Sequence, residues 1–74
     1  MQIYKRIRDL REDRDLTQRE IANKLYMQLE QYRRYETGQR MPPFDFMQAI
    51  ANLYNVSLDY LAGRTDEPRN PNVK

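Results

Sequence analysis

Three charged side chains share one face of a predicted helix and could bind the edges of nucleobases. At 100° per residue, Glu30, Arg33 and Arg34 project from the side opposite Tyr32 and Tyr35, which we expect to be buried. Arginine can donate two hydrogen bonds to guanine O6 and N7, and glutamate can accept one from cytosine N4. The helix is therefore suited to a major groove, although an ordinary solvated face accounts for the same residues.

Apolar residues recur at intervals of three and four along most of the chain, which predicts helices and no strand. Thr17 and Glu20 form a capping box, and Ser57 is a suitable cap for a last helix. Gly38 and Asn55 can end helices in the left-handed region. The predicted helices are 2–13, one from the Thr17 cap to Leu25, 28–37, 43–54, and one between Ser57 and Gly63.

The apolar faces of these helices predict one compact all-α domain of five helices. The second and third helices, joined by a short turn, would form a helix-turn-helix. Residues 65–74 contain two prolines and almost no apolar side chain, so we expect a disordered tail or a linker after a domain of residues 1–64. The predicted core residues are Ile7, Leu10, Ile21, Leu25, Tyr32, Tyr35, Met47, Ile50 and Leu53.

The composition argues against catalysis. The 74 residues include no cysteine and no histidine, which removes thiol nucleophiles and the commonest metal ligand and general base. We therefore expect no enzyme activity, no metal and no cofactor. The formal charge is +2, but residues 1–40 hold ten of the thirteen Lys and Arg and seven of the eleven Asp and Glu, a net +3. A basic half favours an anionic partner, although a solvated surface also explains it.

Nothing in the sequence indicates a membrane protein. No apolar run approaches the length of about 20 residues that a membrane span requires. The residues after Met1 lack the apolar segment of a signal peptide. We expect a cytoplasmic protein that does not bind membranes.

Three stretches follow a fixed pattern over about residues 3–66: Leu16-Thr17-Gln18-x-x-Ile21-Ala22-x-x-Leu25, Tyr35-Glu36-x-Gly38-x-Arg40-x-Pro42, and Val56-Ser57-Leu58-Asp59-Tyr60-Leu61-x-Gly63-Arg64. Together they resemble the phage-repressor and Cro-like helix-turn-helix family of DNA-binding proteins, often called XRE-like. The resemblance implies a lambda-repressor-like DNA-binding domain whose third helix enters the major groove. It also implies that a homodimer binds an inverted repeat in double-stranded DNA.

The resemblance implies roles for particular residues. Gln18 matches a position that contacts a backbone phosphate, and Arg33 would lie at the groove or reach a phosphate. Arg11 and Glu36 match a structural ion pair between the first and third helices. The implied DNA contacts are Gln18, Gln28, Leu29, Glu30, Arg33, Arg34, Thr37, Gln39 and Arg40.

The chain departs from the family pattern at two places. Tyr26 stands where the family usually has glycine, so it would carry backbone strain or re-route the turn. Its ring could reach the DNA backbone or pack over the first helix. Leu29 and Glu30 replace the amide-rich pair of some relatives, so the operator sequence cannot be transferred.

Two functions remain open at this stage. The first is a sequence-specific transcriptional regulator that represses by occupying a promoter. The alternative is an antitoxin-type or multi-component regulator, whose protein partner would bind the C-terminal tail. Four apolar residues near the C-terminus have two possible roles, since they could form a dimer interface or close the core. They are Phe46, Leu58, Tyr60 and Leu61.

Overall fold

The computed structural model describes residues 3–69, which form five helices and no strand, so the predicted all-α fold is confirmed. The predicted first helical residue, Gln2, and positions 70–74 of the predicted tail lie outside the described residues. The helices are α1 (Ile3–Asp13), α2 (Gln18–Lys24), α3 (Leu29–Thr37), α4 (Phe44–Tyr54) and α5 (Leu58–Leu61).

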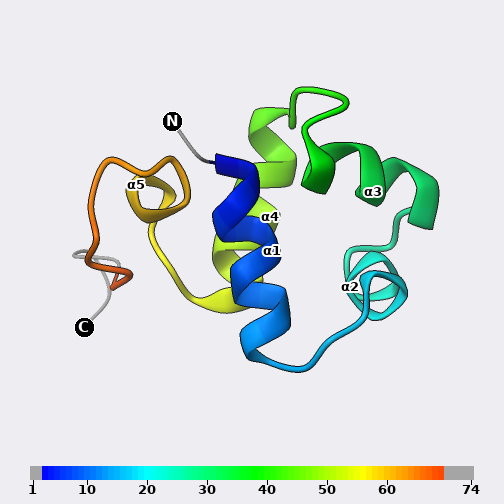
Figure 1. Cartoon of the computed structure of the whole chain (residues 1–74), viewed down its shortest axis with the longest axis horizontal. Helices are drawn as coiled ribbons and strands as arrows, with labels where there is room; N and C mark the ends of the chain where they lie inside the picture. Colours follow the sequence, from blue (N-terminus) through cyan, green and yellow to red (C-terminus); the bar gives the residue numbers. More distant parts are fainter. Residues whose placement is uncertain (1–2, 70–74) are drawn as a thin grey trace.

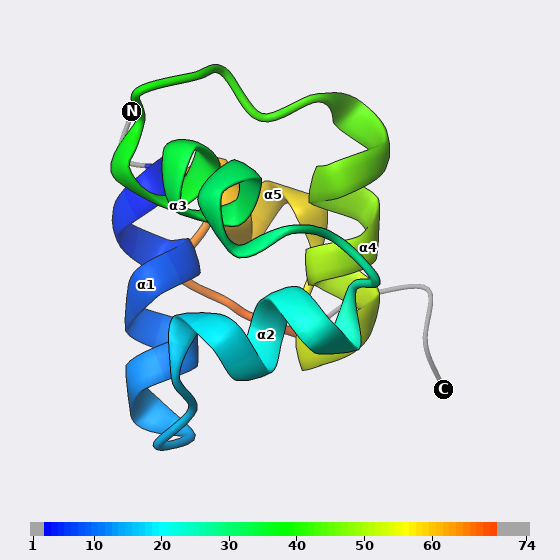
Figure 2. The same cartoon turned by 90° about the vertical axis from the view of Figure 1, so that its right-hand side faces the viewer.

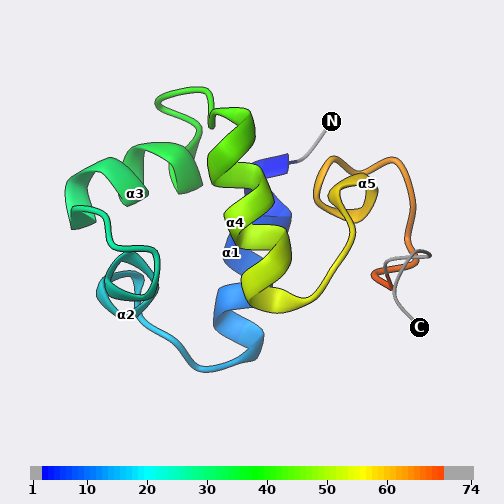
Figure 3. The same ribbon diagram turned by 180° about the vertical axis from the view of Figure 1, so that it is seen from behind.

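The molecule is elongated, with extents of 33 × 23 × 21 Å. Helices α1 and α4 cross its middle, with α2 and α3 on one side and α5 on the other (Figure 1). The view from behind shows the same order with α4 in front of α1 (Figure 3). Helix α1 contacts both α3 and α5, so it joins the two sides. None of the described helices is long and apolar enough to cross a membrane.

The helix ends follow from local side-chain chemistry, as the sequence predicts. The Glu20 amide donates to Thr17 Oγ1 at 3.0 Å, and the Thr17 amide donates to Glu20 Oε1 at 2.8 Å. Ser57 Oγ accepts from the Tyr60 amide at 3.0 Å and caps α5. Gly38 and Asn55 end α3 and α4 at φ values of 81° and 57°. The predicted capping box, N-cap and left-handed ends are all confirmed.

The core lies where α1, α2, α3 and α4 meet, and α5 covers one end of it. Two predicted members, Leu25 and Met47, are only partly buried against it. Of the four residues with two possible roles, Phe46 and Leu61 are buried, which favours the core for them. The buried apolar residues are Ile7, Leu10, Ile21, Ala22, Tyr32, Tyr35, Phe46, Ile50, Ala51, Tyr54, Val56 and Leu61.

The apolar face of α4 is narrower than the sequence pattern indicates. Leu53 was expected in the core but is 36% exposed, so that prediction is wrong. Phe44 begins the three-and-four apolar spacing of this helix, at Phe44, Met47, Ile50, Ala51 and Tyr54, but it is 66% exposed. The buried face of α4 extends from Phe46 to Ala51, an arc of about 140° at 100° per residue, and Leu53 and Phe44 lie just beyond its two edges.

The segment after α5 folds back against the domain. The Ser57 amide donates to the Pro68 carbonyl at 2.9 Å. Arg6 of α1 donates to the carbonyls of Tyr60 and Thr65 at 2.8 and 2.7 Å and to Asp66 Oδ1 at 2.9 Å. Its guanidinium also stacks on the Tyr60 ring, 4.1 Å from the centroid. We call these contacts the Arg6 clasp. The division into a domain of residues 1–64 and a tail of 65–74 remains a prediction.

Candidate nucleic-acid interface

The exposed face of α3 is the one that the sequence singles out. Tyr32 and Tyr35 are buried against the core, and Glu30, Arg33 and Arg34 are exposed on the other side. Figure 2, in which α2 and α3 face the viewer, shows this helix on the outside of the molecule, with α2 crossing below it. The expected split of α3 into a tyrosine face and a charged face is present.

A buried carboxylate fixes the position of α3. Glu36 is only 4% exposed, and its Oε1 accepts from Arg11 Nε at 2.8 Å and from the Tyr32 hydroxyl at 2.7 Å. Its Oε2 accepts from Gln18 Nε2 at 2.7 Å and from Arg11 Nη2 at 3.3 Å. The expected Arg11–Glu36 ion pair is therefore present. We call these four residues the Glu36 cluster; because they come from α1, α2 and α3, they lock the three helices together.

Opposing effects set the charge state of the Glu36 cluster. Burial raises the pKa of Glu36, but the hydrogen bonds from Arg11, Tyr32 and Gln18 outweigh it, so the pKa lies below its ordinary value. Burial, followed by the hydrogen bond to Glu36, raises the pKa of Tyr32. The cluster is thus a carboxylate held by a cation and by neutral donors, as a buried charge requires.

Gln18 connects the Glu36 cluster to the surface of α3. Its Oε1 accepts from Arg33 Nε at 3.1 Å, while its Nε2 donates to Glu36. This amide orientation is dictated by chemistry, because a carboxylate can only accept and a guanidinium can only donate. Arg33 Nη1 in turn donates to Glu30 Oε1 at 3.0 Å. A continuous chain of contacts therefore runs from the interior to the exposed face.

The other residues expected in this region differ in how firmly they are held. Within residues 3–69, the Arg34 guanidinium has no hydrogen bond or ion pair, so it is available to a ligand. Gln28 is the N-cap of α3 but makes no side-chain capping bond, and its side chain is exposed. Leu29 is half-buried at the first position of α3.

The last residue of α3 and the loop after it provide three more of the expected contacts. Thr37, Gln39 and Arg40 are all exposed. The Thr37 hydroxyl donates to the Arg33 carbonyl at 2.8 Å, and the Arg40 amide donates to the Arg34 carbonyl at 3.1 Å. The Arg40 amide bond thus ties the loop to the end of α3, while the side chains of Gln39 and Arg40 stay in solvent.

The turn between α2 and α3 holds a tyrosine in an unfavourable backbone conformation. Tyr26 has a φ of 56° and is 96% exposed. The expected backbone strain is therefore present, since the left-handed region is costly for a residue with a large side chain. The expectation that its ring packs over the first helix is wrong, because an almost fully exposed ring packs on nothing.

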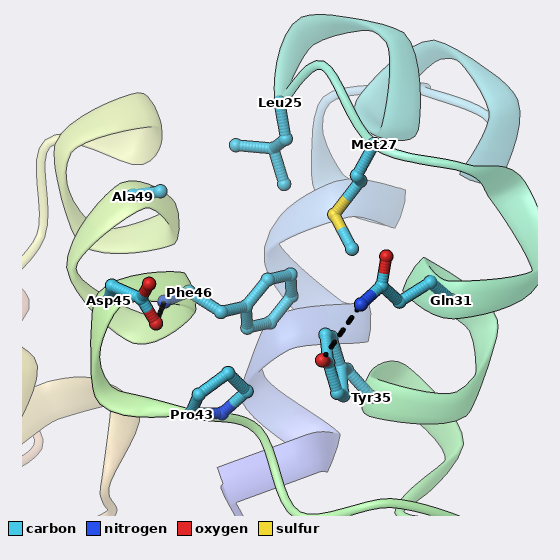
Figure 4. Close-up of a pocket in the computed structure, with 8 residues that line it drawn as sticks. All are labelled: Leu25, Met27, Gln31, Tyr35, Pro43, Asp45, Phe46 and Ala49. Atoms are coloured by element: carbon cyan, nitrogen blue, oxygen red, sulfur yellow. Dashed lines mark hydrogen bonds between the residues drawn. The ribbon is translucent and has the colours of Figure 1, made fainter.

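A shallow open groove borders the opposite flank of α3. It has a volume of about 270 Å³ and lies between the α2–α3 turn and α4. Figure 4 shows Phe46 pointing toward Met27 and Tyr35, and a hydrogen bond of 3.2 Å from Gln31 Nε2 to the Tyr35 hydroxyl. The lining of this groove is mostly apolar and includes no lysine or arginine, whereas binding of nucleic acid needs cations that neutralise its phosphates. The charged face of α3 is therefore the better candidate.

Sequence reasoning missed the contacts that join these residues. The Glu30–Arg33 pair has the i, i+3 spacing of helical ion pairs, so this signal was available. The Gln18–Glu36 and Gln18–Arg33 bonds link positions 18 and 15 residues apart and depend on how α2 packs on α3. Only the fold brings them together.

Two packed helices joined by a tight turn, with a charged outer face on the second, define a helix-turn-helix protein. A family model described as helix-turn-helix matches residues 7–61. The chain belongs to this family, in its XRE-like, phage-repressor branch.

Curated relatives match over most of this chain. It is 40% identical over 63 residues to the uncharacterized HTH-type transcriptional regulator YobD of Bacillus subtilis, covering 85% of this chain and 56% of that protein. It is 38% identical over 66 residues to the HTH-type transcriptional regulator ImmR of Bacillus subtilis, covering 89% and 52%.

A phage repressor is also similar. The chain is 33% identical over 69 residues to the cryptic phage CTXphi transcriptional repressor RstR of Vibrio cholerae, covering 90% of this chain and 62% of the repressor. The chain thus spans about half the length of the first curated relatives it matches. No solved structure matches it significantly.

Proposed function

We propose that this chain is the DNA-binding part of a transcriptional regulator and that it represses by occupying a promoter. The observation that carries the proposal is the exposed charged face of α3, held rigidly by the Glu36 cluster. Similar proteins that are named transcriptional regulators, one of them a phage repressor, support it. In the proposed complex, α3 lies in the major groove of double-stranded DNA.

The interface residues have different tasks in this proposal. Glu30, Arg34 and Gln28 face base edges, with Leu29 near a thymine methyl group. The residues that contact phosphates, which supplies affinity that depends on salt, are Gln18, Thr37 at the end of α3, and Gln39 and Arg40 in the loop after it. Two copies of the chain bind an inverted repeat, because a single short helix reads too few base pairs for tight binding.

The proposal is tested by selecting binding sites from a random duplex library at a salt concentration near physiological. We expect enrichment of an inverted repeat with half-sites about 10 base pairs apart. Weak binding of every duplex that disappears as salt rises would instead mean that the chain is only generically basic, and the proposal would be wrong.

Arg34 provides the sharpest variant for the same assay. We expect Arg34→Gln to weaken binding chiefly at one base position of each half-site, by about 1–3 kcal/mol, because that arginine would read a guanine. Arg64→Gln removes the same charge just after α5, on the other side of the molecule, and should leave the selected sequence unchanged. An equal loss on all sequences for Arg34→Gln would leave it a phosphate contact only.

A further inference from the structure

We propose that Arg33 binds a phosphodiester of the DNA backbone and reads no base, so that the adjacent arginines of α3 have separate tasks. This inference rests on the proposed function and deepens it. The observations that carry it are the contacts of the Arg33 guanidinium, the anchoring of Gln18, and the contrast with Arg34.

The Arg33 guanidinium is already bound to protein on two of its three nitrogens. Nε donates to Gln18 Oε1 at 3.1 Å, and Nη1 donates to Glu30 Oε1 at 3.0 Å. A two-pronged contact with guanine uses Nη2 together with either Nε or Nη1. The single hydrogen of Nε is taken by Gln18. Nη1 gives one of its two hydrogens to Glu30, so a guanine at the Nη1–Nη2 edge would bring its acceptors O6 and N7 beside a carboxylate. A single phosphate oxygen needs only Nη2, which no described residue contacts.

Gln18 lies beside this nitrogen and is itself firmly anchored. Its Nε2 gives one hydrogen to the buried carboxylate of Glu36 at 2.7 Å, and its second amide hydrogen has no partner among the described residues. Arg33 Nε and Gln18 Oε1 are in direct contact, so the two free donors lie on one hydrogen-bonded pair of side chains. Arg33 Nη2 and the second hydrogen of Gln18 Nε2 can therefore bind one phosphate together, without breaking a hydrogen bond of the free protein.

The negative charge of Glu30 gives a reason for the Arg33 guanidinium to lie beside it. A carboxylate on a DNA-facing helix is repelled by the phosphates, and an adjacent guanidinium offsets that repulsion. The Glu30 side chain is 70% exposed, and among the described residues its one partner, Arg33, binds Oε1, so the other oxygen is available to a base. Arg33 thus reduces the repulsion between Glu30 and the phosphates in addition to binding the backbone, and neither effect depends on the DNA sequence.

Arg34 is the natural comparison because it has the same side chain one position along. No described residue binds its guanidinium, so either edge is open for guanine. Replacing each arginine separately therefore tests the assignment within one helix.

The experiment measures DNA affinity and base preference for Arg33→Gln in the full chain, at several salt concentrations. We expect weaker binding by a similar factor on every duplex, and a slope of log K against log salt that is reduced by about 1. The preferred sequence should not change. Arg34→Gln should alter the preference at one position, and Arg64→Gln should leave the preference and the slope as they are.

Arg33→Lys keeps the test decisive if Arg33→Gln fails to fold. Lysine keeps a point charge that can bind a phosphate, but it lacks the planar fork needed for guanine. We expect this variant to retain the salt slope and the preferred sequence of the wild-type chain. Thermal melting of each variant shows whether it is folded.

Two results would contradict the proposals, and they can be told apart. A change of preferred base at one position in Arg33→Gln or Arg33→Lys, with wild-type selectivity intact, would overturn the assignment and leave the proposed function standing. A wild-type chain that enriches no sequence would contradict the proposed function itself, and this assignment with it.

Discussion

At the scale of single residues, Tyr26 has the most strained backbone conformation in the candidate interface. Within residues 3–69, three residues other than glycine have positive φ: Asp15, Tyr26 and Asn55, at 55°, 56° and 57°. Aspartate and asparagine tolerate this region because their short side chains can bond to nearby backbone groups. Tyrosine has no such compensation, and its ring is 96% exposed.

We expect Tyr26→Gly to raise the free energy of unfolding by about 0.5–1 kcal/mol, because glycine adopts this conformation without steric cost. The gain is smaller than the strain itself, since glycine also increases the entropy of the unfolded chain. Urea unfolding measures the difference. Tyr26→Ala is the matched control: it removes the ring but keeps Cβ, so stability should hardly change. A loss of stability in Tyr26→Gly would contradict the assignment of strain.

At the scale of elements, the Glu36 cluster fixes how α2 and α3 pack on α1. We expect Glu36→Gln to lower the free energy of unfolding by about 3 kcal/mol at neutral pH, because it leaves the Arg11 guanidinium without its carboxylate. Glu30→Gln on the same helix is the control. Its carboxylate is exposed, so the change should be under about 0.5 kcal/mol. Equal losses in both variants would refute a special role for the buried residue.

The same cluster predicts how stability depends on pH. Because the pKa of Glu36 is lower in the folded than in the unfolded state, its contribution is fully present above the unfolded value of about 4.3. The contribution is lost as pH falls through the folded pKa. Urea unfolding between about pH 6 and pH 3 should show a steeper acid loss in the wild-type chain than in Glu36→Gln. If the free energy of unfolding fell with pH in the same way in both chains, a carboxylate other than Glu36 would be responsible for the loss of stability in acid.

Local features of these elements could be predicted from the sequence, and the longer-range ones could not. The capping box at Thr17 and the left-handed Gly38 depend on a few neighbouring residues, so their chemistry was readable. Leu53 was misplaced because apolar spacing alone does not say how wide a face the neighbours cover. The two bonds of the Gln18 amide needed the packing of α2 on α3.

At the scale of the whole molecule, the Arg6 clasp joins the first helix to the last described segment. We expect Arg6→Gln to lower the free energy of unfolding by about 2 kcal/mol, because its charged hydrogen bonds are partly buried. Hydrogen exchange at the Ser57 amide, which donates to Pro68, should also accelerate. Arg8→Gln, a neighbouring exposed arginine, should change neither quantity. Unaltered exchange in Arg6→Gln would show that the segment is held without the clasp.

The clasp has a further consequence for how the chain withstands proteolysis. It connects positions 60 residues apart, so the stretch between Arg6 and Asp66 behaves as a loop closed without a covalent bond. Local opening at either end releases the other, which makes the two ends one cooperative unit. A protease that trims the chain from the C-terminal side to Arg64 would therefore also loosen the first turns of α1. The helices that carry the charged face lie on the other side of the molecule, away from this closure.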